Sequence, residues 1–337
     1  MASTTSLGVT LTVLLAVITP SAVLPLYHHR HHHHHDGAPA VGVVEAQPLP
    51  VSSYSNGKGE PKYTSSPLPE ALKAMPYACD DDCVSKLRFK AWEMQGNCTT
   101  CAFAWPATTT MANATTSDIM GIVLYNGAFV DPRSYSVLAS KLASRGVNVI
   151  VPVFPNDLAT DCNGMTLEAV TNAFFPNVTA WMVAGHSYGG VGASYAVAAT
   201  LLCGTSPRVV ALGVIGSYIT KMPQCPVPVP NFEEDDHLHA AVITGNRDLS
   251  INLTNFVDNL NRLPVHTTFT SIIGGNHQQF GSYDPSGRSR LRDRPLIDGN
   301  ATISRDAQLN ATADALVRTL LRATKNNDIS PRSLVDC

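Results

Sequence analysis

Residues 179–190 read TAWMVAGHSYGG, an apolar run followed by a serine between glycines and then by small residues. The apolar run predicts a buried strand, and the Gly-, Ala- and Ser-rich stretch that continues to Leu202 predicts a helix. Ser187 would then lie on a tight turn between the two. Gly185 and Gly189 are small enough to let the strand and helix backbones approach each other. The pattern indicates a nucleophile elbow, which holds a serine hydroxyl above a sheet.

Strand and helix patterns alternate on both sides of this turn. Apolar runs typical of further strands span residues 122–127, 147–154, 209–219, 240–245 and 266–273. Besides the stretch that ends at residue 202, helical patterns span residues 131–146, about 252–263 and 305–322. Because the two patterns alternate, we predict an α/β fold with a mainly parallel sheet and helices on both faces.

A serine hydroxyl is a weak nucleophile unless a base removes its proton. His277 directly follows the last predicted strand, and parallel sheets place their functional loops after the strands. It is therefore the best candidate base among the histidines outside the N-terminal tract, which are His186, His237, His239, His266 and His277. Asp248 follows the preceding strand and is the candidate carboxylate that orients the imidazole. The alternative for Asp248 is a turn or helix-capping role.

A tetrahedral intermediate at Ser187 would also need two backbone N–H donors for its oxyanion. Tyr188 supplies one candidate, since it follows the nucleophile at the start of the predicted helix. The other should come from the turn after the first predicted strand. Ala128 and Phe129 are the favoured residues in that turn.

The histidine loop carries a longer pattern. Residues 274–283 read GGNHQQFGSY and match the loop Gly-Gly-Asn-His-x-Gln-Phe-Gly-x-Tyr of a small lidless group within the α/β-hydrolase superfamily, which the chain resembles. Residues 297–308, IDGNATISRDAQ, resemble the same group, and so does the opening turn through Tyr125, Gly127, Val130, Asp131 and Pro132. The chain order Ser187, Asp248, His277 is also that of α/β-hydrolases.

This resemblance covers about residues 119–321 and implies an α/β-hydrolase fold with an eight-stranded sheet, hydrolysis through an acyl-enzyme and no cofactor. Between Tyr218 and His239 only residues 219–238 are available to cover the site. That stretch is too short for a full helical lid, so we expect an open site. An open site would accept either small or polymeric esters.

The N-terminus indicates export. Residues 1–22 are predicted to be a signal peptide, with an apolar run from Leu7 to Ile18, and an uncleaved signal anchor is the alternative. Six Asn-x-Ser/Thr sequons mark candidate glycosylation sites at Asn97, Asn113, Asn177, Asn252, Asn300 and Asn310. Eight cysteines are expected to pair in such an oxidising compartment, with their connectivity open. We therefore expect a protein that is secreted or lies in the secretory-pathway lumen.

Three further segments surround a predicted hydrolase domain over residues 118–325. Residues 23–75 are rich in His, Pro and Ser and are expected to be disordered. Their histidines offer metal ligands, although a low-complexity tract without a metal role is the simpler interpretation: His28, His29, His31, His32, His33, His34 and His35. Residues 76–117 form a cysteine-rich segment whose disulfides are expected to fasten it to the core. Residues 326–337 form a C-terminal tail.

Composition narrows the classes of function. The 337 residues carry a net charge of −3, so no nucleic-acid partner is expected. Only the N-terminal run approaches a membrane span, and no stable membrane insertion is expected after its cleavage. The leading hypothesis is a secreted serine hydrolase that cleaves carboxylic esters. The alternatives are an amidase or peptidase with the same residues, a non-catalytic binding protein, and a His-rich metal-binding protein; the oligomeric state is open.

Overall fold

The computed structural model describes residue 61 and residues 64–109, 118–204, 206–285 and 297–326. Several predicted features lie outside these residues. They are the signal peptide, the histidine tract, Asn113 and the C-terminal tail beyond residue 326.

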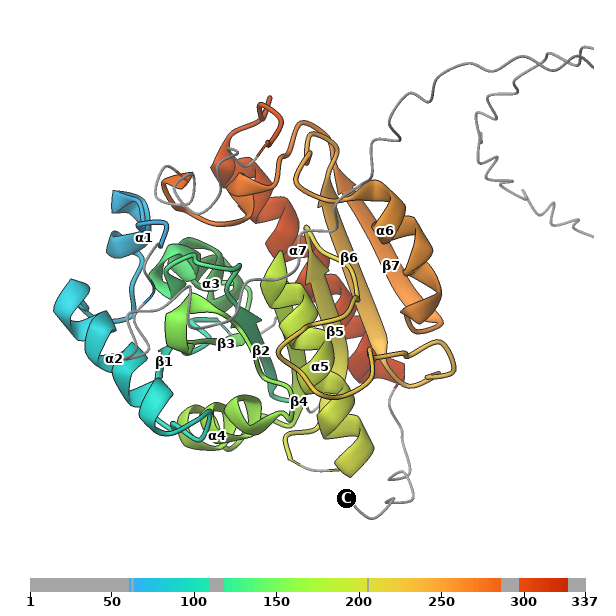
Figure 1. Cartoon of the computed structure of the whole chain (residues 1–337), viewed down its shortest axis with the longest axis horizontal. Coiled ribbons are helices and arrows are strands. Elements are labelled where there is room, and N and C mark those ends of the chain that lie inside the picture. Colours follow the sequence, from blue (N-terminus) through green and yellow to red (C-terminus); the bar gives the residue numbers. More distant parts are fainter. Residues whose placement is uncertain (1–60, 62–63, 110–117, 205, 286–296, 327–337) are drawn as a thin grey trace, which may run out of the picture. The chain divides into compact units, whose positions relative to one another are not determined.

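A seven-stranded sheet forms the centre of the described chain, in the order β1-β3-β2-β4-β5-β6-β7 (Figure 1). The strands are β1 (Ala102–Trp105), β2 (Met120–Tyr125), β3 (Asn148–Pro152), β4 (Ala180–His186), β5 (Val209–Ile215), β6 (His239–Gly245) and β7 (His266–Ile272). β1 runs antiparallel to β3, and every other pair is parallel. The mainly parallel sheet is confirmed. The described residues form seven strands rather than the eight that the resemblance implies, and β1 is the one antiparallel strand among them.

Helices cover both faces of this sheet, as predicted. The helices are α1 (Pro69–Lys73), α2 (Asp81–Glu93), α3 (Ser136–Ala143), α4 (Met165–Phe174), α5 (Tyr188–Cys203), α6 (Leu253–Asp258) and α7 (Arg305–Asn326). α3 and α7 pack on one face, and α4 and α5 pack on the other. Side chains of β2 alternate between the two cores: Ile122 and Leu124 contribute to the first, Val123 and Tyr125 to the second.

The prediction that residues 23–75 are disordered is wrong for residues 64–75. Ser65 pairs with Val130 in a β-bridge, and its N–H donates to Phe129 O at 2.8 Å. Ala71 of α1 is fully buried. Residues 64–75 are ordered because these backbone bonds and this apolar contact attach them to the loop after β2 and to the core.

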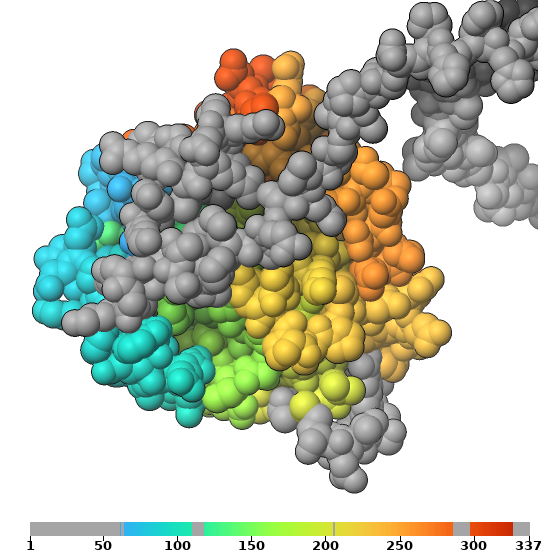
Figure 2. All heavy atoms as spheres, in the orientation of Figure 1, coloured from blue at the N-terminus to red at the C-terminus, as the bar shows by residue number. Residues whose placement is uncertain are grey.

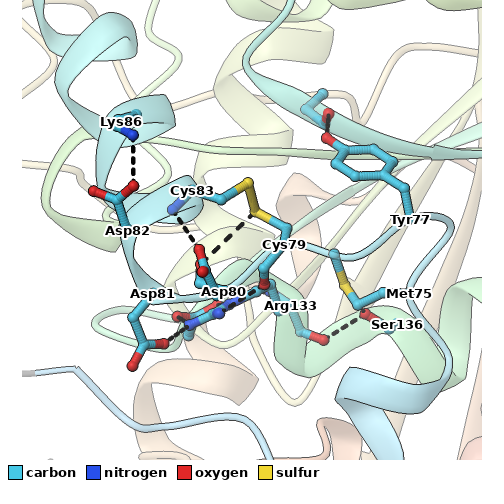
Figure 3. Close-up of a disulfide and its surroundings, with 12 residues drawn as sticks. Met75, Tyr77, Cys79, Asp80, Asp81, Asp82, Cys83, Lys86, Arg133 and Ser136 are labelled. Carbon is cyan, nitrogen blue, oxygen red and sulfur yellow. Dashed lines mark hydrogen bonds and ion pairs between the residues drawn. A yellow bond between two sulfur atoms is a disulfide. The ribbon is translucent and has the colours of Figure 1, made fainter.

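The cysteine-rich segment is not fastened to the core by its disulfides, contrary to expectation. The bridges Cys79–Cys83 and Cys98–Cys101 span four and three positions, so each closes only a local loop beside α2. The segment is attached instead by pairing of β1 with β3 and by ion pairs. One of these lies beside the first disulfide, where Arg133 donates to Asp81 and to the Cys79 carbonyl (Figure 3).

A third disulfide, Cys162–Cys225, joins segments that are 63 positions apart. It links the loop after β3 to residues 219–238, the excursion between β5 and β6 that contributes to the yellow surface in Figure 2. Residues 219–238 contain no helix. Among the described residues no helix is both long enough and apolar enough to span a membrane.

Candidate active site

Ser187 occupies the sharp turn between β4 and α5. Its backbone has φ +54° and ψ −125°, a left-handed conformation that residues with a Cβ rarely adopt. The turn is held on both sides. The Ser187 N–H donates to Ile215 O at 2.9 Å, and Ser187 O accepts from the Gly190 N–H at 2.9 Å and from Ser217 Oγ at 2.6 Å. Strain that is held in this way is typical of functional sites.

Two glycines make the turn sterically feasible. A Cβ on Gly185 would lie 2.0 Å from Gly189 O, and a Cβ on Gly189 would lie 2.5 Å from Tyr125 O. Both distances are far inside van der Waals contact. The close approach predicted from the sequence is therefore present, and it brings the start of α5 against the end of β2.

Asp248 and His277 come together at the ends of β6 and β7. His277 Nδ1 lies 2.8 Å from Asp248 Oδ2, and both side chains are buried. The other carboxylate oxygen, Asp248 Oδ1, accepts from the backbone N–H groups of Ser250 and Ile251. Backbone N–H groups thus fix Oδ1, and Oδ2 faces the imidazole of His277.

Gly216 connects this pair to the serine turn. It follows β5, which lies between β4 and β6, and has φ +51°. A Cβ at Gly216 would lie 3.2 Å from His277 Nδ1 and 3.3 Å from Asp248 Oδ2. The next residue, Ser217, bonds to the carbonyl of Ser187. The three predicted residues therefore lie at the carboxyl ends of β4, β6 and β7, and Gly216 at the end of β5 lies among them.

The other histidines have different environments. His186 is fully buried, with Nδ1 2.8 Å from Tyr135 Oη and its ring centre 4.6 Å from that of His277. The rings of His239 and His266 stack on each other. These residues are the first of β6 and β7, so they lie at the opposite end of the strands from Asp248. Burial lowers the pKa of His239. His237 lies 3.3 Å from the Asp236 carboxylate, also ahead of β6.

Asp298 anchors the histidine loop and was missed by the sequence reasoning. Its carboxylate accepts the backbone N–H groups of His277 at 3.2 Å, Gln278 at 2.9 Å and Gly299 at 2.9 Å. Asp298 lies in the segment 297–308, whose resemblance to the hydrolase group was the available signal.

Gln308 from the same segment completes this anchoring. Its side chain accepts from the Asn276 N–H at 3.1 Å and donates to Asn276 O at 2.6 Å. The Asn276 side chain in turn donates to Gly299 O and accepts from the Gln279 N–H. The residues on each side of His277 are therefore fixed by side-chain amides as well as by Asp298.

The predicted oxyanion donors need one correction. The Phe129 N–H donates to Asp157 O at 2.9 Å, so it is engaged within the protein and is not a donor for an oxyanion. The Gly127 N–H donates to Tyr135 Oη at 2.8 Å. Ala128 remains as the candidate from this turn. Tyr188 is the first residue of α5 and remains the candidate from the serine turn.

The sequons differ in accessibility. Asn97, Asn177, Asn252 and Asn300 are exposed. Asn310 is half-buried on α7, where its side chain accepts from Lys141 and Arg145 and donates to Asp306. Among the residues that the structure describes, no group of three or more His, Cys, Asp or Glu side chains could hold a metal ion.

One family model and several solved structures are similar to this chain. The model of the Alpha/beta hydrolase family matches residues 121–310, more than half of the chain. A search of curated proteins found no match. The butyrate-bound thermophilic esterase Est2 of the Planctomycetes species Thermogutta terrifontis is 12% identical, with a TM-score of 0.42 over 69% of this chain and 91% of that chain.

Two other solved structures are similar at the same level. MGS-M1, an alpha/beta hydrolase enzyme from a Medee basin deep-sea metagenome library, is 16% identical, with a TM-score of 0.42 over 66% of this chain and 92% of that one. The esterase domain of a Rhodothermus marinus protein is 14% identical, with a TM-score of 0.41 and the same coverage. With the family model matching across the sheet from β2 to α7, the chain belongs to the alpha/beta hydrolase family.

Proposed function

We propose that this chain is a serine hydrolase that cleaves carboxylic esters through an acyl-enzyme. Ser187 is the nucleophile, His277 the general base and Asp248 the carboxylate that orients the base. The observation that carries the proposal is the 2.8 Å contact between the buried His277 Nδ1 and Asp248 Oδ2, beside a strained serine turn. A buried carboxylate at Nδ1 selects the tautomer whose Nε2 accepts a proton.

The reaction follows from these roles. His277 Nε2 takes the proton of Ser187 as Oγ attacks the ester carbonyl. The backbone N–H groups of Ala128 and Tyr188 stabilise the oxyanion that forms. The intermediate then collapses, and His277 gives its proton to the departing alcohol. Water, deprotonated by the same imidazole, releases the acid and restores Ser187.

The excursion over residues 219–238 would form one border of the substrate site. Tyr188 Oη donates to Gln224 Oε1 at 2.7 Å, so the excursion reaches the residue next to the nucleophile. Cys225 fastens it through the disulfide to Cys162. A border without a helix supports an open site for a small or polymeric ester.

We also propose that the protein follows the secretory route, either to the outside or to the lumen, after removal of residues 1–22. The exposed positions of four sequons support this proposal, because a glycosylated asparagine must be accessible. The disulfides support it as well, since such bonds persist in oxidising compartments.

Hydrolysis of 4-nitrophenyl acetate, compared with the matching 4-nitroanilide, tests the proposal. Ser187→Ala and His277→Ala should each lower kcat by at least about 10⁴-fold while the far-UV spectrum is unchanged. His266→Ala is the matched control, because His266 lies at the amino-terminal end of β7, and this variant should keep kcat within about twofold. Retained turnover in either of the first two variants would contradict the assignment. Preferential cleavage of the anilide would identify an amidase instead.

A further inference from the structure

A buried cluster of four charged side chains lies behind the loop that carries Ala128. Arg88 comes from α2, Asp131 and Arg133 follow the loop, and Asp157 comes from the turn after β3; none is more than 4% exposed. Arg88 Nε and Nη2 donate to the two carboxylate oxygens of Asp157, each at 2.8 Å. Its Nη2 also donates to Asp131 at 2.9 Å, and Arg133 bonds the same carboxylate. A bidentate pair of this kind fixes both position and orientation.

The main chain of Asp157 holds the candidate oxyanion loop. Its carbonyl oxygen accepts from the Phe129 N–H and from Asn126 Nδ2, both at 2.9 Å. Asn126 Nδ2 also bonds the carbonyls of Gly127 and Val130. Ala128 lies between these anchored residues. The direction of the Ala128 N–H therefore depends on where the Asp157 carbonyl lies.

The turn that presents this carbonyl is left-handed. Asn156 has φ +60° and Asp157 has φ +52°, a conformation that Asn and Asp adopt more readily than other residues with a Cβ, but less readily than glycine. Such a conformation persists only when its surroundings hold it. The side chain of Asp157 is held by Arg88 and by the Thr64 hydroxyl, which donates to Oδ2 at 2.7 Å. Arg88 makes two hydrogen bonds to this carboxylate and Thr64 makes one, so loss of Arg88 would remove most of the hold on the side chain and should let the turn and its carbonyl shift.

We propose that Arg88 is a positioning residue for the oxyanion hole and acts through the main-chain carbonyl of Asp157. The inference rests on the proposed function, because it assigns a role in stabilising the tetrahedral intermediate. Arg88 does not touch substrate; it determines where the Ala128 N–H points. The proposal also gives the cysteine-rich segment a function, because its helix α2 carries Arg88 as well as Cys83 of the first local disulfide.

The test compares Arg88→Met with Lys86→Met, which removes an exposed cation from the same helix. Wild-type turnover of 4-nitrophenyl acetate, shown to depend on Ser187, is measured first. Arg88→Met should then lower kcat about 100-fold, the cost of losing one oxyanion donor, with KM within about twofold. Inhibition by phenylboronic acid, which forms a tetrahedral adduct, should weaken by a similar factor. Lys86→Met should change neither quantity.

Two further variants sharpen the result. Arg88→Lys keeps the charge but loses the bidentate geometry, so its kcat should lie between those of wild type and Arg88→Met. Thr64→Val removes only one hydroxyl donor to Asp157 and should lower kcat and boronate affinity about threefold. Because this change is small, the variant should fold even if Arg88→Met does not.

If the wild-type activity depends on Ser187, two results would overturn the role of Arg88 without affecting the proposed function. The first is that the Arg88 and Thr64 variants have the same kcat and the same boronate affinity as Lys86→Met. The second is a raised KM with unchanged kcat, which would indicate a role in substrate binding. An inactive wild-type chain would instead contradict the proposed function, and the inference would fall with it.

Discussion

Replacing Asp298 with alanine should loosen the loop that carries His277. The carboxylate accepts three backbone N–H groups at 2.9–3.2 Å, from His277, Gln278 and Gly299, and a fourth, from Leu249, at 3.5 Å. A hydrogen bond to a charged group contributes about 1.5–3 kcal/mol, but these three share one half-buried side chain and do not add. We expect Asp298→Ala to lower the free energy of unfolding by about 2–4 kcal/mol.

The same change should also reduce turnover. Once the His277 N–H loses its acceptor, the imidazole can shift relative to Ser187, and a displacement of about 1 Å costs about 100-fold in rate. We expect kcat to fall about 10–100-fold at a temperature where the variant remains folded. Asp298→Asn keeps an oxygen acceptor without the charge, and should lose about half as much stability.

Urea denaturation and steady-state kinetics on the same samples measure both effects. Asp306→Ala is the control, because it removes an exposed carboxylate near the start of α7. Unchanged kcat in Asp298→Ala, or a stability loss no larger than that of Asp306→Ala, would refute the anchoring role.

Three other changes probe the site and its surroundings. Gly216→Ala should lower stability by about 1–2 kcal/mol and kcat about tenfold, as measured by denaturation and ester turnover, because φ is +51° and the new Cβ would press on His277 and Asp248. Burial, together with the charge of Asp131, raises the pKa of Asp157 from 3.8 to about 6 against the effect of Arg88. The folded chain then binds this proton more tightly than the unfolded chain, so the contribution of Asp157 to stability is full below pH 3.8 and is lost as the pH rises through about 6. At about 1.4 kcal/mol per pH unit, the unfolding free energy of wild type relative to Asp157→Asn should fall by about 3 kcal/mol between pH 3.8 and 7; a difference independent of pH would contradict this. Glycopeptide mapping of protein from a eukaryotic secretory host should find Asn97, Asn177, Asn252 and Asn300 occupied and Asn310 bare, and full occupancy at Asn310 would show that its hydrogen bonds do not protect it.

The parallel core could be predicted because its signals are local. β4 is a continuous apolar run between turn residues, and all seven of its residues are buried. α2 was missed because its buried face consists of Val84, Arg88 and Ala91, and an arginine does not count as apolar in a periodicity argument. Its burial is possible only because Asp157 and Asp131, distant in sequence, supply its partners.

The site could be predicted only in part for the same reason, because some of its contacts join segments that are distant in the sequence. Ser187, Asp248 and His277 could be placed at the ends of β4, β6 and β7 from the strand patterns and the chain order. The engagement of Phe129 could not be predicted, since it depends on a carbonyl from the turn after β3. Asp298 lies 21 positions beyond His277, and its role arises from a return of the chain that no local pattern specifies.

The central claim, that Ser187 is a nucleophile activated by His277, is tested most directly by covalent labelling with a fluorophosphonate probe. The folded, disulfide-intact protein is labelled and the adduct is located by mass spectrometry, with Ser187→Ala and His277→Ala in parallel. We predict one adduct, on Ser187, that is absent from the first variant and at least about 100-fold slower to form in the second. No adduct, or an adduct on Ser187 that forms equally fast without His277, would contradict the account.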